Sequence, residues 1–502
     1  MDRLAVGGWR LAVLTPLPPA RTGVAHYASM LLPALRNAVG SVDAFDSLDD
    51  WTTGRLDDYD YVIYQLGNNP HHELIYAEAM KRPGIVVLHD LVLHHLIVEM
   101  TLARGDADAY VAALEANHGA PGAAWARGRA AGLHSEMGNF LLPASVEVAQ
   151  RAQSVIVHNQ YAHDRLRSFG VTTLIHVVPH PYVPETRVFD RGTMFSREQR
   201  VIGFFGFLTS AKRVEVVLEA FRIARAKDPR LALLIVGEPA PNIDASSFAS
   251  DGVVMTGYVA DDDFPRYYAV ADRFVNLRYP SAGETSGTLI RALDAGKPVA
   301  VSDYAQFAEL PDDVVFKVPL GVGEVERLVE FFTSDLPDPS EKQRAWLKEN
   351  AALEKTVEGY LRALDSVILS RVDGEGSPAV NASRAIGRGS FAVYAAQDDR
   401  AALPLFPSLE VVSADPLVIK NIGDATIRTR VYGEPEYRLI VKWLVGEVVV
   451  HDQWLALPKD LHPGETTEIE LPRRKADTLR LYHAMQDVPM LEPEPWETVR
   501  VR

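Results

Sequence analysis

Four consecutive residues, Glu284-Thr285-Ser286-Gly287, combine a carboxylate, two hydroxyl groups and a glycine. They follow the apolar run Arg273–Arg278 and precede a segment in which apolar residues recur at helical spacing, so they are expected between a buried strand and a helix. The first turn of a helix presents unbonded N–H groups and the positive end of the helix dipole. Such a terminus favours an anion, above all a phosphate. The pattern predicts a phosphate-binding loop that suits a nucleotide sugar.

Short runs of Val, Ile and Leu alternate with helical stretches over the first 370 residues. The expected strands are Leu11–Leu14, Tyr61–Tyr64, Ile85–Leu88, Ser154–Val157, Ile175–Val178, Val201–Gly206, Leu231–Val236, Val253–Val259, Arg273–Arg278 and Val299–Val301. Strands that are apolar throughout indicate parallel sheets covered by helices on both faces. The expected helices include Leu91–Gln150, Val214–Ala226, Asp261–Ala271 and Glu341–Leu369.

The proline-rich segment Pro179–Arg200 separates the two series of strands and predicts a connection between two doubly wound α/β domains. In such sheets ligands bind beyond the carboxyl ends of the strands. The loops after the strands of both domains are therefore expected to face one cleft.

Composition excludes several classes of protein. The chain has 502 residues, which predicts two to four domains, and no cysteine, which excludes disulfides, thiolate zinc sites and cysteine nucleophiles. A net charge of −16 argues against nucleic acid as a partner. The N-terminus lacks a basic region followed by a long apolar core, so no signal peptide is expected, and there is no run of about 18 apolar residues. We expect a cytoplasmic protein without an integral membrane segment, and peripheral membrane contact stays open.

The last quarter of the chain has a different pattern. Residues 372–403 are rich in glycine, serine and alanine without periodicity, which predicts a linker. From 404 to 502, alternating apolar and polar residues, as in Tyr437–Trp443, are separated by turn signals such as Pro463-Gly464. This pattern predicts an antiparallel, immunoglobulin-like β-sandwich.

In order and spacing, short motifs from about Arg10 to Leu369 resemble the GT-B glycosyltransferases, and in particular glycosyltransferase family 4. The motifs are Thr15-Pro16-Leu17-Pro18-Pro19 with Gly23, His89-Asp90, Gly206 with Lys212, Ile235-Val236-Gly237, Thr256-Gly257-Tyr258, Gly283-Glu284 and Ala295-Gly296-Lys297-Pro298. The C-terminal sandwich is similar to β-domains appended to some bacterial polysaccharide-synthesis enzymes.

The resemblance implies transfer of a sugar, with retention of anomeric configuration, from a UDP- or GDP-linked donor to an acceptor hydroxyl. The acceptor would be a glycan, a lipid-linked sugar or a small molecule, and no cofactor or metal is needed. The resemblance also implies an acceptor-side domain over 1–184 and a donor domain over 185–371, and the last helix of the donor domain returns to the first domain. The oligomeric state stays open.

The departing nucleotide diphosphate requires positive charge, and Lys212 is the best candidate cation for it. An ordinary residue at a helix start is the alternative, although a cation there opposes the helix dipole. Arg213 is adjacent and is expected to point elsewhere. The family often places an arginine soon after the glycine that matches Gly206, whereas this chain has Phe207, so this part of the phosphate clamp is either missing or supplied by another residue such as Arg278.

By resemblance, Gly23 and Gly237 would let the backbone approach the donor, and Glu284 would bind the hydroxyls of its sugar. The alternatives are a loop glycine before a helix for Gly23, and a carboxylate stabilised by a helix dipole for Glu284. Thr285, Ser286 and Gly287 would line the phosphate site, and Tyr258 would lie near the nucleobase. The family's second glutamate, which binds the ribose, is absent, and Arg291 or Ala292 occupies its place.

His89 and Asp90 follow an expected strand end, and the resemblance implies that one of them contacts the donor sugar or the acceptor hydroxyl. Together with His94 and His95 they do not form a recognised zinc spacing, so a metal site is not expected. Two other functions fit the same residues: a GT-B nucleotide-sugar epimerase, and a catalytically degenerate sugar-binding protein.

Overall fold

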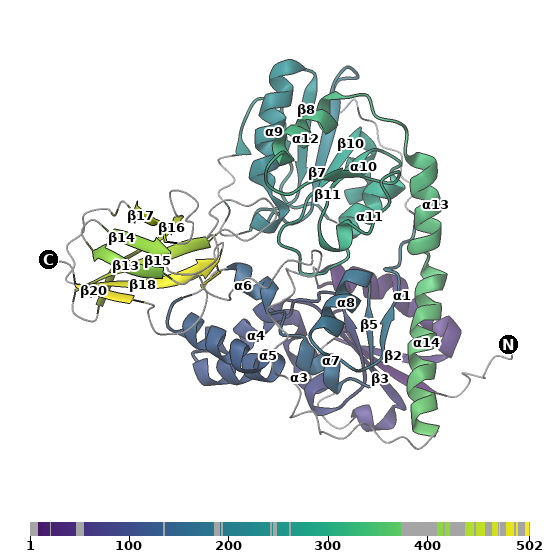
Figure 1. Ribbon diagram of the computed structural model, residues 1–502. Helices are drawn as coiled ribbons and strands as arrows, with labels where there is room; N and C mark the ends of the chain where they lie inside the picture. The colour runs from purple at the N-terminus through teal and green to yellow at the C-terminus, as the bar shows by residue number, and fades with distance from the viewer. Residues whose placement is uncertain are drawn as a thin grey trace.

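A computed structural model gives the arrangement of the chain. It describes residues 9–372, except 21, 47–54, 134–135, 185–190, 192–193, 241–242, 244–247 and 261–262. Further along, it describes residues 409–414, 417–421, 437–445, 448–456, 464–469, 471, 478–485, 488–489 and 497–500. Figure 1 shows two α/β lobes stacked one above the other, with the C-terminal sheets to one side. The predicted linker at 372–403 lies outside the described residues, apart from Val372.

The N-terminal lobe is built on a six-stranded parallel sheet in the order β2-β1-β3-β4-β5-β6. Its strands are β1 (Arg10–Leu14), β2 (Ser41–Phe45), β3 (Tyr61–Leu66), β4 (Ile85–Leu88), β5 (Ser154–Val157) and β6 (Ile175–Val177). Its helices are α1 (Gly23–Val39), α3 (Glu73–Lys81), α4 (His94–Met100), α5 (Ala107–Ala130), α6 (Glu136–Leu141), α7 (Val146–Arg151) and α8 (Gln160–Ser168).

Successive residues of the inner strands face opposite cores. On β1, Leu11 and Val13 pack with α1, whereas Ala12 and Leu14 belong to the core on the other face of the sheet. All four are fully buried, which is why their sequence shows no polar alternation.

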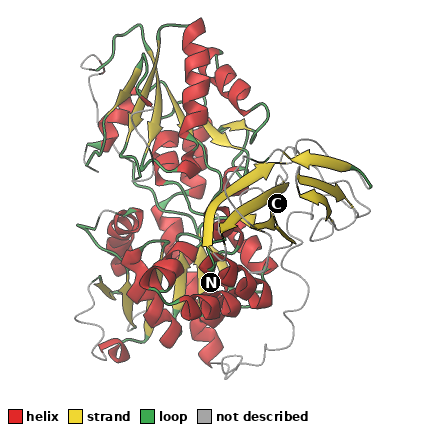
Figure 2. Cartoon of the chain, turned by 90° about the vertical axis from the view of Figure 1, so that its left-hand side faces the viewer, coloured by secondary structure: helices red, strands yellow, loops and turns green. Residues whose placement is uncertain are grey.

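The C-terminal lobe repeats this design with the order β12-β11-β10-β7-β8-β9, again parallel. Its strands are β7 (Arg200–Phe205), β8 (Leu231–Val236), β9 (Val253–Met255), β10 (Arg273–Asn276), β11 (Val299–Ser302) and β12 (Phe316–Val318). Its helices are α9 (Val214–Lys227), α10 (Phe264–Val270), α11 (Gly287–Asp294), α12 (Glu324–Thr333) and α13 (Ser340–Asn350). Figure 2 shows helices on both faces of each lobe's sheet.

The chain crosses between the lobes twice, and the two crossings lie side by side. After α13 it enters α14 (Leu353–Val372), which packs on α1 in the N-terminal lobe, where the hydroxyls of Tyr360 and Tyr27 are 2.9 Å apart (Figure 1). At the crossings the Tyr182 N–H donates to the carbonyl of Ala351 at 2.9 Å, and Thr356 Oγ1 donates to the carbonyl of Pro179 at 3.0 Å.

The C-terminal residues form antiparallel strands in two sheets. One has the order β13-β14-β17, and the other β16-β15-β18-β19 with β20 paired to β18. The strands are β13 (Leu409–Ala414), β14 (Leu417–Asn421), β15 (Tyr437–Val445), β16 (Val448–Ala456), β17 (Thr466–Ile469), β18 (Thr478–Met485), β19 (Val488–Pro489) and β20 (Glu497–Arg500). The immunoglobulin-like sandwich stays a prediction, because most connections between these strands lie outside the described residues.

Several expected boundaries were wrong. The expected strand Val253–Val259 ends at Met255, and Gly257, two residues further on, has a φ of +68°. The strand expected to reach Arg278 ends at Asn276. The helix expected over Leu91–Gln150 is four helices; even within α5 the backbone is non-helical at Gly119, with a φ of 65°. Apolar periodicity does not reveal these breaks, which glycine conformations and polar turns produce.

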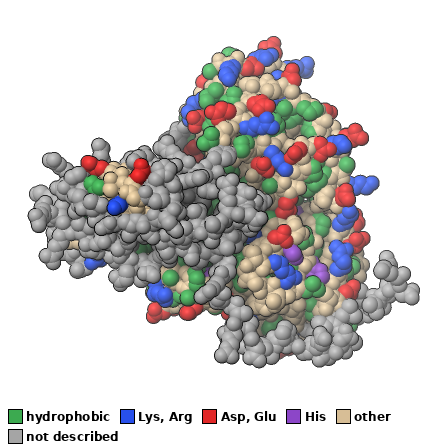
Figure 3. Space-filling view, in the orientation of Figure 1, with side chains coloured by type: hydrophobic (Ala, Val, Ile, Leu, Met, Phe, Trp, Pro, Cys, Tyr) green, Lys and Arg blue, Asp and Glu red, His purple; other side chains and the backbone are tan. Residues whose placement is uncertain are grey.

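No described helix is both long enough and apolar enough to cross a membrane. On the face drawn in Figure 3, acidic and basic side chains are interspersed over the C-terminal lobe, as the chain's acidic but mixed composition leads one to expect.

Candidate functional site between the two lobes

The loop from β10 to α11 carries Glu284, Thr285 and Ser286 and leads into Gly287. Ser286 is the N-cap of α11, and its Oγ accepts from the N–H of Leu289 at 3.2 Å. Gly287 begins the helix, and a side chain built there would meet no atom within 4 Å. The start of α11 therefore opens onto free space, as an anion-binding helix terminus requires.

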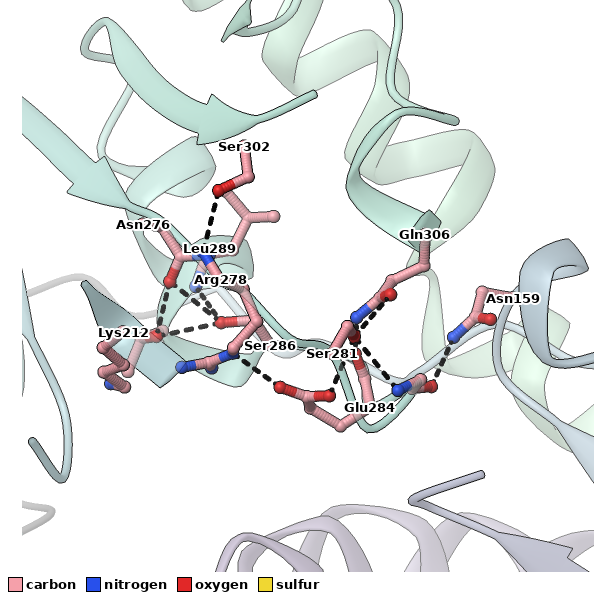
Figure 4. Close-up of polar contacts among 12 residues, drawn as sticks. Asn159, Lys212, Asn276, Arg278, Ser281, Glu284, Ser286, Leu289, Ser302 and Gln306 are labelled. Atoms are coloured by element: carbon pink, nitrogen blue, oxygen red, sulfur yellow. Dashed lines mark hydrogen bonds and ion pairs between the residues drawn. The ribbon is translucent and has the colours of Figure 1, made fainter. Parts of the chain in front are cut away.

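Glu284 lies in this loop and forms an ion pair with Arg278, whose Nε is 2.6 Å from Glu284 Oε1. Both side chains are largely shielded, at 11% exposure for Arg278 and 21% for Glu284. Gln306 donates to the backbone carbonyl of Glu284 at 2.7 Å and so fixes the loop. Figure 4 shows the Glu284 carboxylate below the loop, on the side of the N-terminal lobe.

Lys212 ends a short 3-10 helix, η5 (Ser210–Lys212), and its side chain is buried. Its Nζ donates to the carbonyl of Phe205 at 2.6 Å. Burial holds the pKa of Lys212 well below its usual range; the charge of Arg278 lowers it further, and Glu284 opposes the shift. A buried amine with one carbonyl partner retains donors for an incoming anion.

Gly206 makes room for this lysine. Its φ is +98°, and a Cβ at this position would lie 2.4 Å from Lys212 Nζ. Gly237 has a φ of +147°, and a Cβ there would lie 2.2 Å from the carbonyl oxygen of Gly206. Both positions accept only glycine, because the loops after β7 and β8 approach each other and the lysine too closely for a side chain.

Asn276, which the sequence analysis did not select, joins this group at the end of β10. Its Oδ1 accepts from Ser286 Oγ and from Thr288 Oγ1, both at 3.1 Å. Its Nδ2 is buried and has no hydrogen-bond partner among the described residues. A polar residue at the end of an apolar strand was the available signal for it. Figure 4 shows Asn276, Lys212 and Ser286 in the same part of the site.

Arg213 and Tyr258 lie differently. Arg213 forms a two-point ion pair with Glu324, which uses its guanidinium, so it does not join Lys212. Tyr258 follows β9 and is 53% exposed. Thr285 is half-buried in the loop before the Ser286 cap.

The N-terminal lobe contributes Asp90, which accepts from the N–H of Asn68 at 2.8 Å. Burial, followed by the nearby Glu284 carboxylate, raises the pKa of Asp90 to about 7, although Asn68, Arg278 and His95 act in the opposite direction. The residues that follow Asp90 contact the Glu284 loop: a Cβ on Gly283 would lie 2.6 Å from Leu91 Cβ, so Asp90 lies close to the C-terminal lobe.

His89 lies deeper than Asp90. It is 8% exposed, its Nε2 is 3.2 Å from Gln65 Oε1, and its ring packs against those of Tyr27 and His158. Burial, aided by three neighbouring histidines, holds the pKa of His89 well below its usual range. His89 is therefore neutral at pH 7 and lies in the interior of the N-terminal lobe.

Gly23 begins α1 after the loop that follows β1, and a Cβ there would meet no atom within 4 Å. Thr22 caps this helix by accepting from the N–H of Ala25 at 3.0 Å. No group of three or more His, Asp or Glu side chains in the described part of the chain is arranged to hold a metal ion.

Direct bonds join the lobes around the Glu284 loop. The N–H of Val92 donates to the carbonyl of Ala282 at 3.0 Å, and Asn159 Nδ2 donates to the carbonyl of Gly283 at 2.9 Å. Glu309 of the C-terminal lobe accepts from the N–H groups of Gln160 and Tyr161, at the start of α8. The structure is thus closed, and the cluster of Lys212, Arg278, Glu284 and Ser286 lies at the interface between the lobes.

Comparison with known proteins agrees with this geometry. Residues 199–330 match the family model described as "Glycosyl transferases group 1". Mannosylfructose-phosphate synthase of Agrobacterium fabrum is 30% identical over 125 residues, which is 22% of this chain and 26% of that protein. The match thus spans about a quarter of the curated relative.

Solved structures resemble the two lobes at low identity. Sucrose-phosphate synthase of Thermosynechococcus elongatus is 13% identical, with a TM-score of 0.50, and the match covers 72% of this chain and all of that one. Anabaena HepE, solved with UDP and glucose, is 14% identical with a TM-score of 0.47, over 72% of this chain and all of that chain. The family match therefore covers residues 199–330 in the C-terminal lobe, and the two Rossmann-like lobes together have the GT-B fold.

Proposed function

We propose that the chain is a glycosyltransferase that moves a sugar from a nucleotide-diphosphate sugar to an acceptor hydroxyl. The observation that carries the proposal is the convergence of buried Lys212, buried Arg278 and the open first turn of α11 at the interface of two lobes. Cations and free backbone N–H groups at one point suit a diphosphate leaving group, whose negative charge grows as the glycosidic bond breaks.

Each site residue has a role in this proposal. Lys212 and Arg278 neutralise the diphosphate, and the N–H groups of Ser286 and Gly287 bind it. Glu284, which Arg278 and Gln306 hold in place, accepts hydrogen bonds from sugar hydroxyls. Asp90 approaches the same sugar, or the acceptor hydroxyl, from the other lobe.

The glycines and Tyr258 define the remainder of the donor site in the proposal. Gly206 and Gly237 leave room for the diphosphate, Gly23 opens the N-terminal lobe toward it, and Tyr258 lines the nucleobase end. Arg213 is not assigned to the phosphate site, because its guanidinium is paired with Glu324.

We further propose that the transfer retains anomeric configuration and needs no metal ion. Two buried cations supply the charge that a divalent metal would otherwise provide at the diphosphate. The donor would be UDP- or GDP-linked, and the acceptor a glycan, a lipid-linked sugar or a small molecule. A role in bacterial polysaccharide or glycoconjugate synthesis in the cytoplasm belongs to the same proposal.

The test is to incubate the full chain with UDP-, GDP- and ADP-linked sugars and to measure release of the nucleoside diphosphate. We expect release with one donor class, unchanged by EDTA, and a glycoside of the donor's own anomeric configuration by NMR. The Lys212→Met variant is the control for contaminating activity. Interconversion of nucleotide sugars would indicate an epimerase instead, and absence of both turnover and donor binding would refute an enzyme of this class.

A further inference from the structure

The turn that carries Lys212 has an unusual residue at its end. Arg213 has a φ of 56° and a ψ of 40°, the left-handed conformation that glycine adopts freely and an L-residue adopts at a cost. The turn forms a sharp corner between η5 and α9, since the N–H of Arg213 bonds to Ser210 and the first turn of α9 begins at Val214. A non-glycine residue in this conformation requires compensating interactions elsewhere.

Glu324 supplies those interactions. Arg213 Nε lies 2.6 Å from Glu324 Oε1, and a second guanidinium nitrogen lies 2.5 Å from Oε2, which is the planar two-point geometry that arginine forms with carboxylates. The Glu324 side chain is 2% exposed, and its Oε2 also accepts from the N–H of Gly321 at 2.9 Å. A carboxylate this deeply buried is stable only with its partner in place.

The same turn is bonded to the loop that carries Glu284. The N–H of Tyr279, at the start of that loop, donates to the carbonyl of Ala211 at 2.7 Å, and the Arg213 guanidinium lies 5.8 Å from the centre of the Tyr279 ring. Lys212 thus lies between Ala211, which is bonded to Tyr279, and Arg213, which is bonded to Glu324. Its own side chain reaches the carbonyl of Phe205, directly beside Gly206.

We propose that Arg213 and Glu324 are positioning residues for Lys212, and that their buried ion pair holds the ammonium group where it meets the diphosphate of the donor. The inference rests on the proposed function for the identity of the donor. It predicts that the pair affects ligand binding only through Lys212.

The variants follow from the geometry. Arg213→Gly removes the guanidinium and keeps a residue that accepts a φ of 56°. Glu324→Gln keeps the shape and the acceptor for Gly321 but removes the charge. The double variant Arg213→Gly/Glu324→Gln avoids a buried unpaired carboxylate, so it serves if Arg213→Gly alone does not fold. Asp272→Asn is the control, because Asp272 also forms a two-point pair in this lobe, with Arg191 at 2.6 and 2.8 Å, but at the opposite ends of the strands.

Two readouts are needed. The first is the affinity for inorganic pyrophosphate by calorimetry, and the second is kcat/KM for the donor. We expect Arg213→Gly to lower both by about 10²-fold, the size of effect that a misplacement of about 1 Å produces. In a Lys212→Met background the same substitution should have no further effect. Asp272→Asn should lower the melting temperature while leaving pyrophosphate affinity unchanged.

Unchanged affinity in Arg213→Gly and in the double variant would overturn the inference. So would a further loss when Arg213→Gly is added to Lys212→Met, since the pair would then act independently of the lysine. A wild-type chain that binds pyrophosphate with this dependence on Lys212 and Arg213, but turns over no nucleotide sugar, would refute the proposed function and support the positioning role. A wild-type chain that binds no pyrophosphate would refute both.

Discussion

Replacing Lys212 by methionine should separate stability from activity. The side chain is buried, its pKa is held well below the usual range, and within the described part of the chain its Nζ donates to the Phe205 carbonyl. Methionine has a similar length and no charge. Removing a buried charge relieves a desolvation penalty of several kcal/mol, and leaving the Phe205 carbonyl without its donor costs about 1–3 kcal/mol, so we expect a net change of about 0 to +3 kcal/mol.

Donor turnover, in contrast, should decrease in Lys212→Met. If Lys212 contacts the diphosphate as its charge develops, removing the ammonium resembles removal of one donor from an oxyanion hole, which costs about 2.7–4 kcal/mol in the transition state. This energy corresponds to a decrease of about 10²–10³-fold in kcat. The loss should appear in donor turnover and in pyrophosphate affinity alike.

The assay combines thermal unfolding with donor kinetics on the same preparation. A change of 1 kcal/mol shifts the melting temperature by about 2–4 °C for a domain of 150–250 residues, so the variant should melt at or above the wild-type temperature. A melting temperature lower by more than about 4 °C would show that Lys212 supports the fold. Donor kinetics within threefold of wild type would show that it lies outside the site, and either result refutes the reasoning.

Three further outcomes are expected. The folded-state pKa of Asp90 is about 7, above its usual value, so between about pH 4 and pH 7 the folded chain binds a proton that the unfolded chain has lost. The free energy of unfolding should therefore fall as pH rises through that window. In urea unfolding at pH 5 and pH 8, Asp90→Asn should remove this fall. Because burial lowers the pKa of Lys212 in the free chain and a bound diphosphate favours the protonated amine, pyrophosphate affinity should begin to fall with rising pH earlier than it would for an ordinary lysine, and Lys212→Met should lose this dependence. Glu309→Gln should destabilise the closed arrangement of the lobes by about 0.5–2 kcal/mol, which is the contribution of a carboxylate at a helix N-terminus. The radius of gyration in X-ray scattering should then increase. An unchanged radius would contradict the role of Glu309 in holding the lobes together.

The two-lobed fold follows from the sequence because continuous apolar runs leave few alternatives to covered parallel strands. Runs such as Leu231–Val236, all six residues of which are buried, were predicted to within a residue. β2 and β12 were missed because they lie at sheet edges: Ser41–Phe45 exposes alternate residues, and Phe316–Val318 has three residues. Short edge strands depend on a neighbour that a local pattern does not reveal.

The candidate site was partly predictable for a related reason. Glu284, Ser286 and Lys212 stand out because their types are unusual at the start of a helix or beside a glycine turn. Glu309 and Glu324 do not stand out, because their roles depend on contacts with residues far away in the sequence; Arg213 and Glu324, for example, are 111 positions apart. Periodicity places a residue on an element and does not identify its partner in another.

The paired crossings near Tyr182 and Ala351 also determine how the two lobes are able to move. Because the connecting segments are hydrogen-bonded to each other, we expect them to act as one pivot for any rotation of the lobes. The return of the chain also makes α14 part of the N-terminal core, through Tyr360 and Leu364. A fragment that ends at Asn350 would lose both the second connection and the cover of α1, so neither the pivot nor the N-terminal lobe should survive that truncation.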